Sequence, residues 1–137
     1  MSTVFGFREN QHTADWELEV WAADFPSLLE QSARGMYTLS GMRLQDGSRQ
    51  ARTIKLLGDD AESLLVRFLT ELLWLEQEEG LAFDSFSISV DEQYTLKAEL
   101  GGSPISNLDK EIKAVTYHNL TVQTTDLGLR VIIVFDV

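Results

Sequence analysis

Acidic residues near both ends of the chain form the pattern with the clearest chemical meaning. The motif HTAD places Asp15 directly before a predicted strand, and Asp136 and Val137 close the chain at the end of another. If those strands are antiparallel neighbours, the start of one meets the end of the other. Asp15, Asp136 and the α-carboxylate of Val137 would then lie together. Carboxylates packed that closely need a compensating cation or basic group to remain ionised. Oxygen ligands at that density suit Ca²⁺, Mg²⁺ or Mn²⁺.

A structural interpretation of the same residues stays open. Asp15 could cap a turn, and Asp136 could be solvated at the end of its strand. Zinc is a weaker alternative. His12 and His118 could bind it together with carboxylates, but they are isolated in sequence and no helical H-x-x-x-H pair is present.

Other kinds of chemistry find little support in the sequence. Cysteine is absent, no G-x-S-x-G motif occurs, and GGSP at 101–104 lacks the Lys-Ser/Thr of a phosphate loop. With 22 acidic residues in the chain, a carboxylate pair for acid–base catalysis could be assembled almost anywhere, so such pairs carry no information. The group Glu76, Glu78 and Glu79 is interpreted as a solvated surface, with a docking face for a basic partner as the alternative.

Composition favours one globular domain that covers residues 1–137. Hydrophobic residues make up 44% of the chain and charged residues 24%, close to the globular average. The net charge of −11 disfavours direct tight binding of nucleic acid and favours hard cations and basic protein surfaces. The absence of cysteine, of a signal-like stretch and of a membrane-length apolar run leads us to expect a cytoplasmic protein without membrane association.

Hydrophobic periodicity predicts two helices. The first begins after Asp24, has Pro26 in its first turn and ends before Gly41. The second has Asp59 and Glu62 at capping-box spacing and ends at Gly80. Its apolar stripe at i, i+3 and i+4 is typical of a helix that covers a sheet.

Alternation of apolar and polar residues predicts the strands, which lie at 16–21, 52–57, 85–90, 94–100, 111–123 and 127–137. Residues 101–109 are expected to form a long loop. The last strand lacks clean alternation, which is typical of a position inside the sheet. We therefore predict an α+β fold: a two-layer α/β sandwich with a mixed, largely antiparallel sheet and two main helices packed on one face.

Three stretches resemble the archease family, in the family's order and over essentially the whole chain. They are HTAD, residues 64–83, and EIKAVTYH at 111–118 together with the closing segment 128–137. The resemblance implies a non-enzymatic accessory protein of the tRNA-splicing RNA ligase, which joins RNA ends with GTP and a divalent metal. Archeases promote formation of the ligase–guanylate intermediate and multiple turnover, in tRNA splicing or RNA repair.

The resemblance also implies a site. The family's metal ligands fall on Asp15, Asp136 and Val137, and His12 and Lys113 match further motif positions as candidate supporting residues. The implied cofactor is a divalent ion, Ca²⁺ first, with Mg²⁺ or Mn²⁺ as alternatives, and the implied partner is a GTP-dependent RNA ligase.

The sequence departs from the family pattern at two places and leaves other functions open. Trp16 and Glu17 stand where the family usually has a small aliphatic residue and Gly, and the segment 101–109 is short and lacks a His often found there. The alternative function is a metal-independent, chaperone-like module that stabilises a nucleic-acid-modifying enzyme. A metal-dependent hydrolase is disfavoured, because no general base or substrate pocket can be identified.

Overall fold

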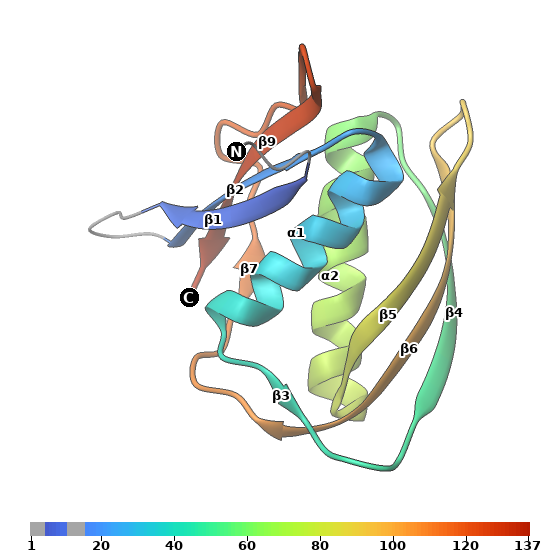
Figure 1. Cartoon of the computed structure of the whole chain (residues 1–137), viewed down its shortest axis with the longest axis vertical. Helices are drawn as coiled ribbons and strands as arrows, with labels where there is room; N and C mark the ends of the chain where they lie inside the picture. Colours follow the sequence, from blue (N-terminus) through green and yellow to red (C-terminus); the bar gives the residue numbers. More distant parts are fainter. Residues whose placement is uncertain (1–4, 11–15) are drawn as a thin grey trace.

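Two long helices lie between two sheets in the computed structural model, which describes residues 5–10 and 16–137 (Figure 1). The first sheet has the order β1 (Gly6–Asn10), β2 (Trp16–Ala22), β9 (Gly128–Asp136) and β7 (Ala114–Val115), and β8 (Gln123–Thr125) also pairs with β9. The second sheet contains β3 (Arg43–Leu44), β6 (Thr95–Asn107), β4 (Gln50–Leu57) and β5 (Leu81–Val90).

The predicted α+β class with two main helices is confirmed, and its arrangement is corrected in detail. The strands form two sheets rather than one mixed sheet, and every pairing among the described residues is antiparallel. The helices contact strands of both sheets, so their apolar surface is covered from two sides.

The first helix, α1 (Phe25–Leu39), begins and ends as predicted. The Asp24 side chain accepts a hydrogen bond from the Ser27 N–H at 2.8 Å, which satisfies one of the unpaired donors of the first turn. Pro26 lies in that turn, where its missing N–H has no intrahelical partner. After Ser40 the chain turns at Gly41 with φ +68°.

The second helix, α2 (Ala61–Glu79), has its cap one residue later than predicted. Asp60, not Asp59, is the N-cap, and Ser63, not Glu62, completes the capping box. The Ser63 N–H donates to Asp60 Oδ1 at 2.7 Å and the Ser63 hydroxyl accepts from the Asp60 N–H at 3.1 Å. Glu62 is unavailable for this role because its carboxylate accepts a hydrogen bond from the Val122 N–H at 2.7 Å. The helix ends at Gly80, as expected.

The core lies between the helices and the inner faces of the two sheets. Side chains with less than 2% exposure come from both helices and from strands of both sheets; they include Leu28, Leu29, Met36, Leu64, Phe68, Leu72, Leu18, Phe135 and Leu96. The predicted stripe of α2 therefore forms the centre of the core. No helix of the described chain combines the length and hydrophobicity needed to span a membrane.

The long loop predicted at residues 101–109 is wrong, because β6 continues through Asn107. Gly102 permits this continuation: a Cβ atom there would overlap the carbonyl oxygen of Ala82 on β5. The pairing shifts its register between Phe83 and Ser85, and β5 then remains paired with β6 as far as Leu81 and Pro104. The glycines that resembled a loop signal serve the close approach of two strands.

The strand predicted at residues 111–123 is also wrong. The expected continuous strand is reduced to β7 and the first residue of β8, with a turn between them in which the Leu120 N–H donates to the Tyr117 carbonyl. Asn119 has φ +51°, a conformation that does not fit a strand.

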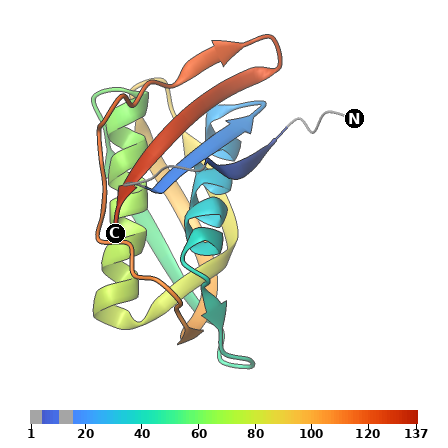
Figure 2. The ribbon, with the colours of Figure 1, turned by 90° about the vertical axis from the view of Figure 1, so that its left-hand side faces the viewer.

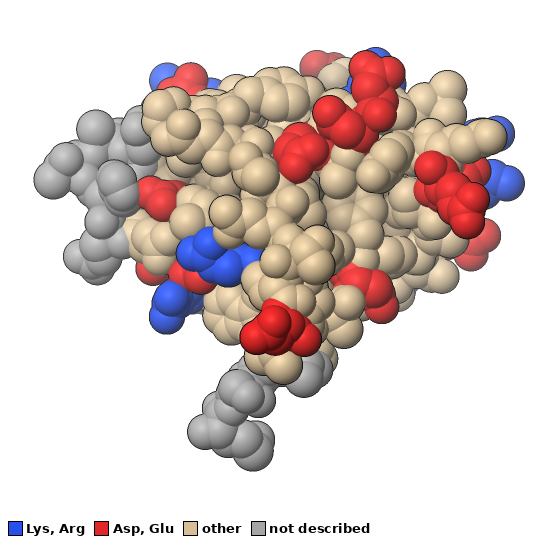
Figure 3. All heavy atoms as spheres, turned by 90° about the horizontal axis from the view of Figure 1, so that it is seen from above, with Lys and Arg blue, Asp and Glu red and all other residues tan. Residues whose placement is uncertain are grey.

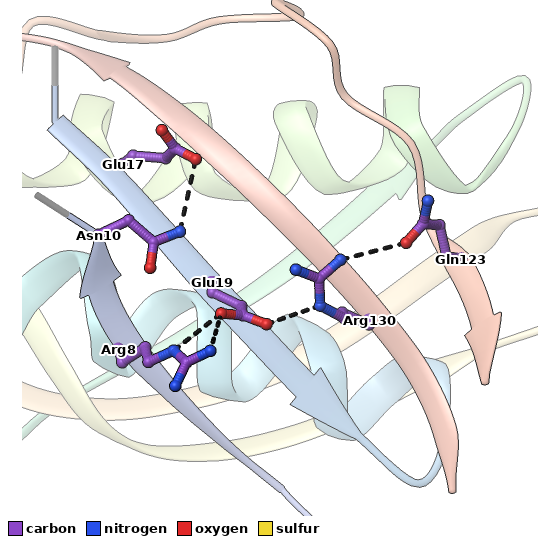
Figure 4. A network of polar contacts seen from close by, with 6 residues as sticks. All are labelled: Arg8, Asn10, Glu17, Glu19, Gln123 and Arg130. Carbon is purple, nitrogen blue, oxygen red and sulfur yellow. Dashed lines mark hydrogen bonds and ion pairs between the residues drawn. The ribbon is translucent and has the colours of Figure 1, made fainter. Parts of the chain in front are cut away.

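Glu19 connects three strands of the first sheet (Figure 4). It lies on β2 and accepts hydrogen bonds from Arg8 Nε on β1 at 2.8 Å and from Arg130 Nε on β9 at 2.6 Å, while Arg130 also donates to Gln123 on β8. The Glu19 side chain is 10% exposed. Burial acts to raise its pKa, but the hydrogen bonds from Arg130 and Arg8 outweigh burial, so the pKa lies below its ordinary value of 4.5.

We expect Glu19→Gln to lower the free energy of unfolding at pH 7 by about 1–3 kcal/mol, because the two arginines lose a charged acceptor. The lowered pKa of Glu19 means that its ionised form stabilises the fold above pH 4.5 and that this stabilisation is lost as pH falls through the folded-state pKa. Urea titrations from pH 3 to 7 measure both effects. Glu9→Gln, at an exposed site on β1, is the control; an equal effect there would contradict a specific role for Glu19.

Candidate functional site

The pairing of β2 with β9 places the beginning of one strand beside the end of the other (Figure 2). Trp16, the first residue of β2, is opposite Phe135, and Asp136 follows directly. The antiparallel adjacency expected from the sequence is therefore present. Two of the residues predicted for this site, His12 and Asp15, lie outside the described residues.

Asp136 is held by backbone contacts on the other side of β9. The Lys113 N–H donates to the Asp136 carbonyl at 2.8 Å, and Ala114 on β7 is paired with Asp136. The Asp136 side chain is exposed, and its carboxylate takes part in no hydrogen bond or ion pair with the described residues. Val137 is half-buried and packs against the core. The structure thus brings Lys113, Asp136 and Val137 together.

The segment before β7 is fixed by the end of α1. The N–H groups of Asp109 and Lys110 both donate to the Ser40 carbonyl, at 2.9 and 3.1 Å. Asp109 also accepts from the Asn107 amide at 2.8 Å and packs closely over Gly41, where a Cβ atom would overlap its carboxylate. These contacts set the path of the chain that leads to Lys113.

Trp16 has a structural role at the start of β2. The Lys110 ammonium lies 5.9 Å from the centre of the Trp16 ring, within the range of a cation–π contact. The indole also packs partly against the core. This departure from the family pattern therefore links the segment before β7 to the strand that follows Asp15.

Among the described residues, Asp136 is the one side-chain carboxylate of the predicted metal site. Asp136 offers an exposed carboxylate without a competing partner, and carboxylate oxygens are the ligands that Ca²⁺, Mg²⁺ and Mn²⁺ prefer. No group of at least three His, Cys, Asp or Glu side chains that could hold a metal occurs within residues 5–10 and 16–137. His118 lies in an exposed turn beside Asn119, 3.3 Å between the two side-chain nitrogens.

The solvated surface predicted for the three glutamates at the end of α2 is wrong for Glu76. Glu78 and Glu79 are exposed, and Glu79 accepts a hydrogen bond from Arg52 Nε at 3.0 Å, but Glu76 is only 8% exposed. Burial raises the pKa of Glu76 to about 7, and the charge of Glu111 adds to the shift. The sequence did indicate that Glu76 is buried, because Glu76 is four residues after Leu72 and so lies on the buried stripe of the helix.

Tyr37 on α1 is a second buried titratable group in this region. Burial raises the pKa of its phenol above the ordinary value; the Phe83 backbone opposes part of the shift and the charge of Glu76 adds to it. Tyr37 therefore stays protonated, and the shift of the Glu76 pKa comes from its burial and from the charge of Glu111.

We expect Glu76→Gln to stabilise the protein at pH 8 by about 1–2 kcal/mol, less than the full shift implies because solvent screens part of the charge. A raised folded-state pKa means that the parent loses stability as pH rises from about 4.5 through about 7. Parent and variant should therefore be nearly equal near pH 5 in thermal or urea unfolding. Glu78→Gln, at an exposed site, should change little at either pH, and a flat pH dependence of the Glu76 effect would disprove the assignment.

Comparison with known proteins gives a consistent result. The model of the family described as "Archease protein family (MTH1598/TM1083)" matches residues 7–137. The chain belongs to the archease family. The archease of Archaeoglobus fulgidus is 31% identical over 135 residues, which cover 96% of this chain and 98% of that protein. The archease of Pyrococcus abyssi is 28% identical over 120 residues, or 82% of this chain and 84% of that protein.

Two solved structures show the same fold. The solution structure of protein 1598 of Methanobacterium thermoautotrophicum has a TM-score of 0.74 at 22% identity and covers 96% of this chain and 99% of its own. The crystal structure from Thermotoga maritima, described as an archease and possible chaperone, has a TM-score of 0.67 at 22% identity and covers 95% and 94%. At this level of identity the likeness concerns the fold.

Proposed function

We propose that this archease-family protein is a non-catalytic accessory protein of a GTP-dependent RNA ligase, whose guanylylation and multiple turnover it promotes in tRNA splicing or RNA repair. In this proposal Asp15, Asp136 and Val137 bind a divalent ion, with His12 and Lys113 in support. The observation that supports it most is the register of β2 and β9, which places the strand after the HTAD motif beside Asp136.

The charge of the protein fits such a role. At a net charge of −11 the chain is repelled by RNA phosphates and attracted to basic protein surfaces, so contact with the ligase protein is favoured over contact with its RNA. A bound divalent ion would supply charge neutralisation for the phosphates of GTP during nucleotidyl transfer. The exposed Asp136 carboxylate and the Lys113 contact that holds its backbone would position the oxygen ligands near the surface, where a partner's active site can reach them.

We expect Asp136→Asn to reduce Ca²⁺ or Mn²⁺ binding measured by calorimetry, and to lower the stimulation of ligase guanylylation about tenfold or more, because an amide oxygen is a weaker ligand than a carboxylate. Asp15→Asn should act in the same way. The control is Asp126→Asn at the exposed turn between β8 and β9, which removes the same charge elsewhere on the first sheet. Full stimulation by both site variants would refute metal participation.

The second candidate is a metal-independent, chaperone-like module that stabilises the nucleic-acid-modifying enzyme. The description of the Thermotoga protein as a possible chaperone favours it. A chelator separates the two: EDTA added to archease alone, followed by removal of excess chelator, should abolish stimulation while leaving ligase binding intact if the metal is required. Stimulation that persists after metal removal would favour the chaperone-like role.

A further inference from the structure

A groove of about 550 Å³ lies at the opposite end of β9 from Asp136. The beginnings of α1 and α2 form one side, and the turn between β5 and β6 and the segment around β8 form the others. The start of β9 contributes Leu129. Leu129 and Asp136 are seven positions apart along the strand, about 23 Å at the usual rise per residue. The groove is therefore a separate place from the candidate metal site.

The floor of the groove is apolar and partly aromatic. Six half-buried side chains form it: Phe25, Pro26, Val90, Tyr94, Val122 and Leu129. Phe25 and Tyr94 meet edge to face, with ring centres 6.4 Å apart. The Tyr94 backbone has an unusual φ of +58°. The Tyr94 N–H donates a hydrogen bond to the Asp91 carbonyl, which fixes the residue in the turn.

The rim of the groove is acidic. Asp60, Glu62, Asp91 and Glu92 line it, and none of the described lining residues is Lys or Arg. Figure 3 looks onto this end of the molecule and shows acidic side chains spread over its surface.

Three of these carboxylates are fixed by backbone N–H groups. Asp60 accepts from Ser63, Glu62 from Val122 and Asp91 from both Gln93 and Thr95, at 2.7–2.9 Å. The N–H groups of Thr95 and Gln93 hold the pKa of Asp91 below its ordinary value. These hydrogen bonds preorganise the acidic rim, which lowers the entropic cost of binding.

We propose that this groove docks a short peptide segment of a protein partner in which Arg or Lys alternates with large apolar residues. Carboxylates around aromatic rings are the chemistry that recognises guanidinium and ammonium groups, through ion pairs and cation–π contacts. The apolar floor takes the neighbouring aliphatic side chains. Nucleic acid is excluded as an occupant because its phosphates would face four carboxylates. The inference rests on the proposed function only in that it assigns the groove to a protein partner.

The test is NMR titration of the full chain with a synthetic octapeptide of alternating Leu and Arg. We expect the amides of Phe25, Val90, Tyr94 and Leu129 to shift, and octapeptides of Leu–Gln or Gly–Arg to bind at least about fivefold more weakly, because each retains only half of the recognised chemistry. Shifts spread over other acidic surfaces, or equal binding of Gly–Arg, would overturn the proposal. So would concentration-dependent shifts of the same amides without peptide, which would identify a second copy of the chain as the occupant.

Matched variants test the rim. Glu62→Gln combined with Glu92→Gln removes two charges while keeping the acceptor for Val122, and should weaken the Leu–Arg peptide about fivefold. Asp46→Asn combined with Glu78→Gln removes two charges at exposed sites away from the groove and should leave binding within about twofold. If both double variants weakened peptide binding equally, the effect would come from net charge alone, and docking of the peptide in the groove would be refuted.

The ligase assay separates this inference from the proposed function. If the parent chain fails to stimulate a GTP-dependent RNA ligase but still binds the peptide in the groove, the proposed function fails and the docking site stands. If the parent stimulates the ligase and the rim variants neither lose peptide binding nor change the concentration needed for half-maximal stimulation, the docking site fails and the function stands.

Discussion

The antiparallel pairing of β2 with β9 is the interaction on which the rest of the molecule depends. It joins residues more than a hundred positions apart, from Trp16 opposite Phe135 to Ala22 opposite Leu129. A loop of that length has a large closure entropy, which buried side chains such as Leu18, Ile133 and Phe135 must offset. The pairing also sets the geometry of the proposed site. The same register that buries these side chains places the end of β9 beside the residue that follows the HTAD motif.

The strongly negative charge of the chain is accommodated in three different ways. Glu19 is compensated by Arg8 and Arg130 within the first sheet. Asp60 and Asp91 accept hydrogen bonds from backbone N–H groups of a helix cap and a turn. Glu76 has neither kind of partner among the described residues, and burial shifts its pKa toward neutrality. The exposed carboxylate of Asp136 has no partner among the described residues, which leaves its oxygens open to an external cation or a basic surface.

The strand β9 gives the protein two chemically different ends. Asp136 and Val137 lie at one end, next to the Lys113 N–H, and Leu129 lies at the other, in an apolar groove with an acidic rim. The strand between them pairs with β2 from Leu129 to Phe135, which fixes their separation. An accessory protein that must hold a partner and act on it at a distance gains from such a spacer, because binding at one end does not use the residues of the other.

Local sequence patterns determined both helices, the strands around 16–21, 52–57 and 128–136, and the α+β class, because periodicity and caps depend on neighbours within a few residues. They also singled out Asp136 as a candidate ligand. Tertiary structure alone decided that the strands form two sheets and that Gly102 allows β6 to continue. It alone decided that residues from five separate segments form the groove. In each case the deciding contact joins residues distant in sequence, and the energy of such a contact leaves no trace in local periodicity.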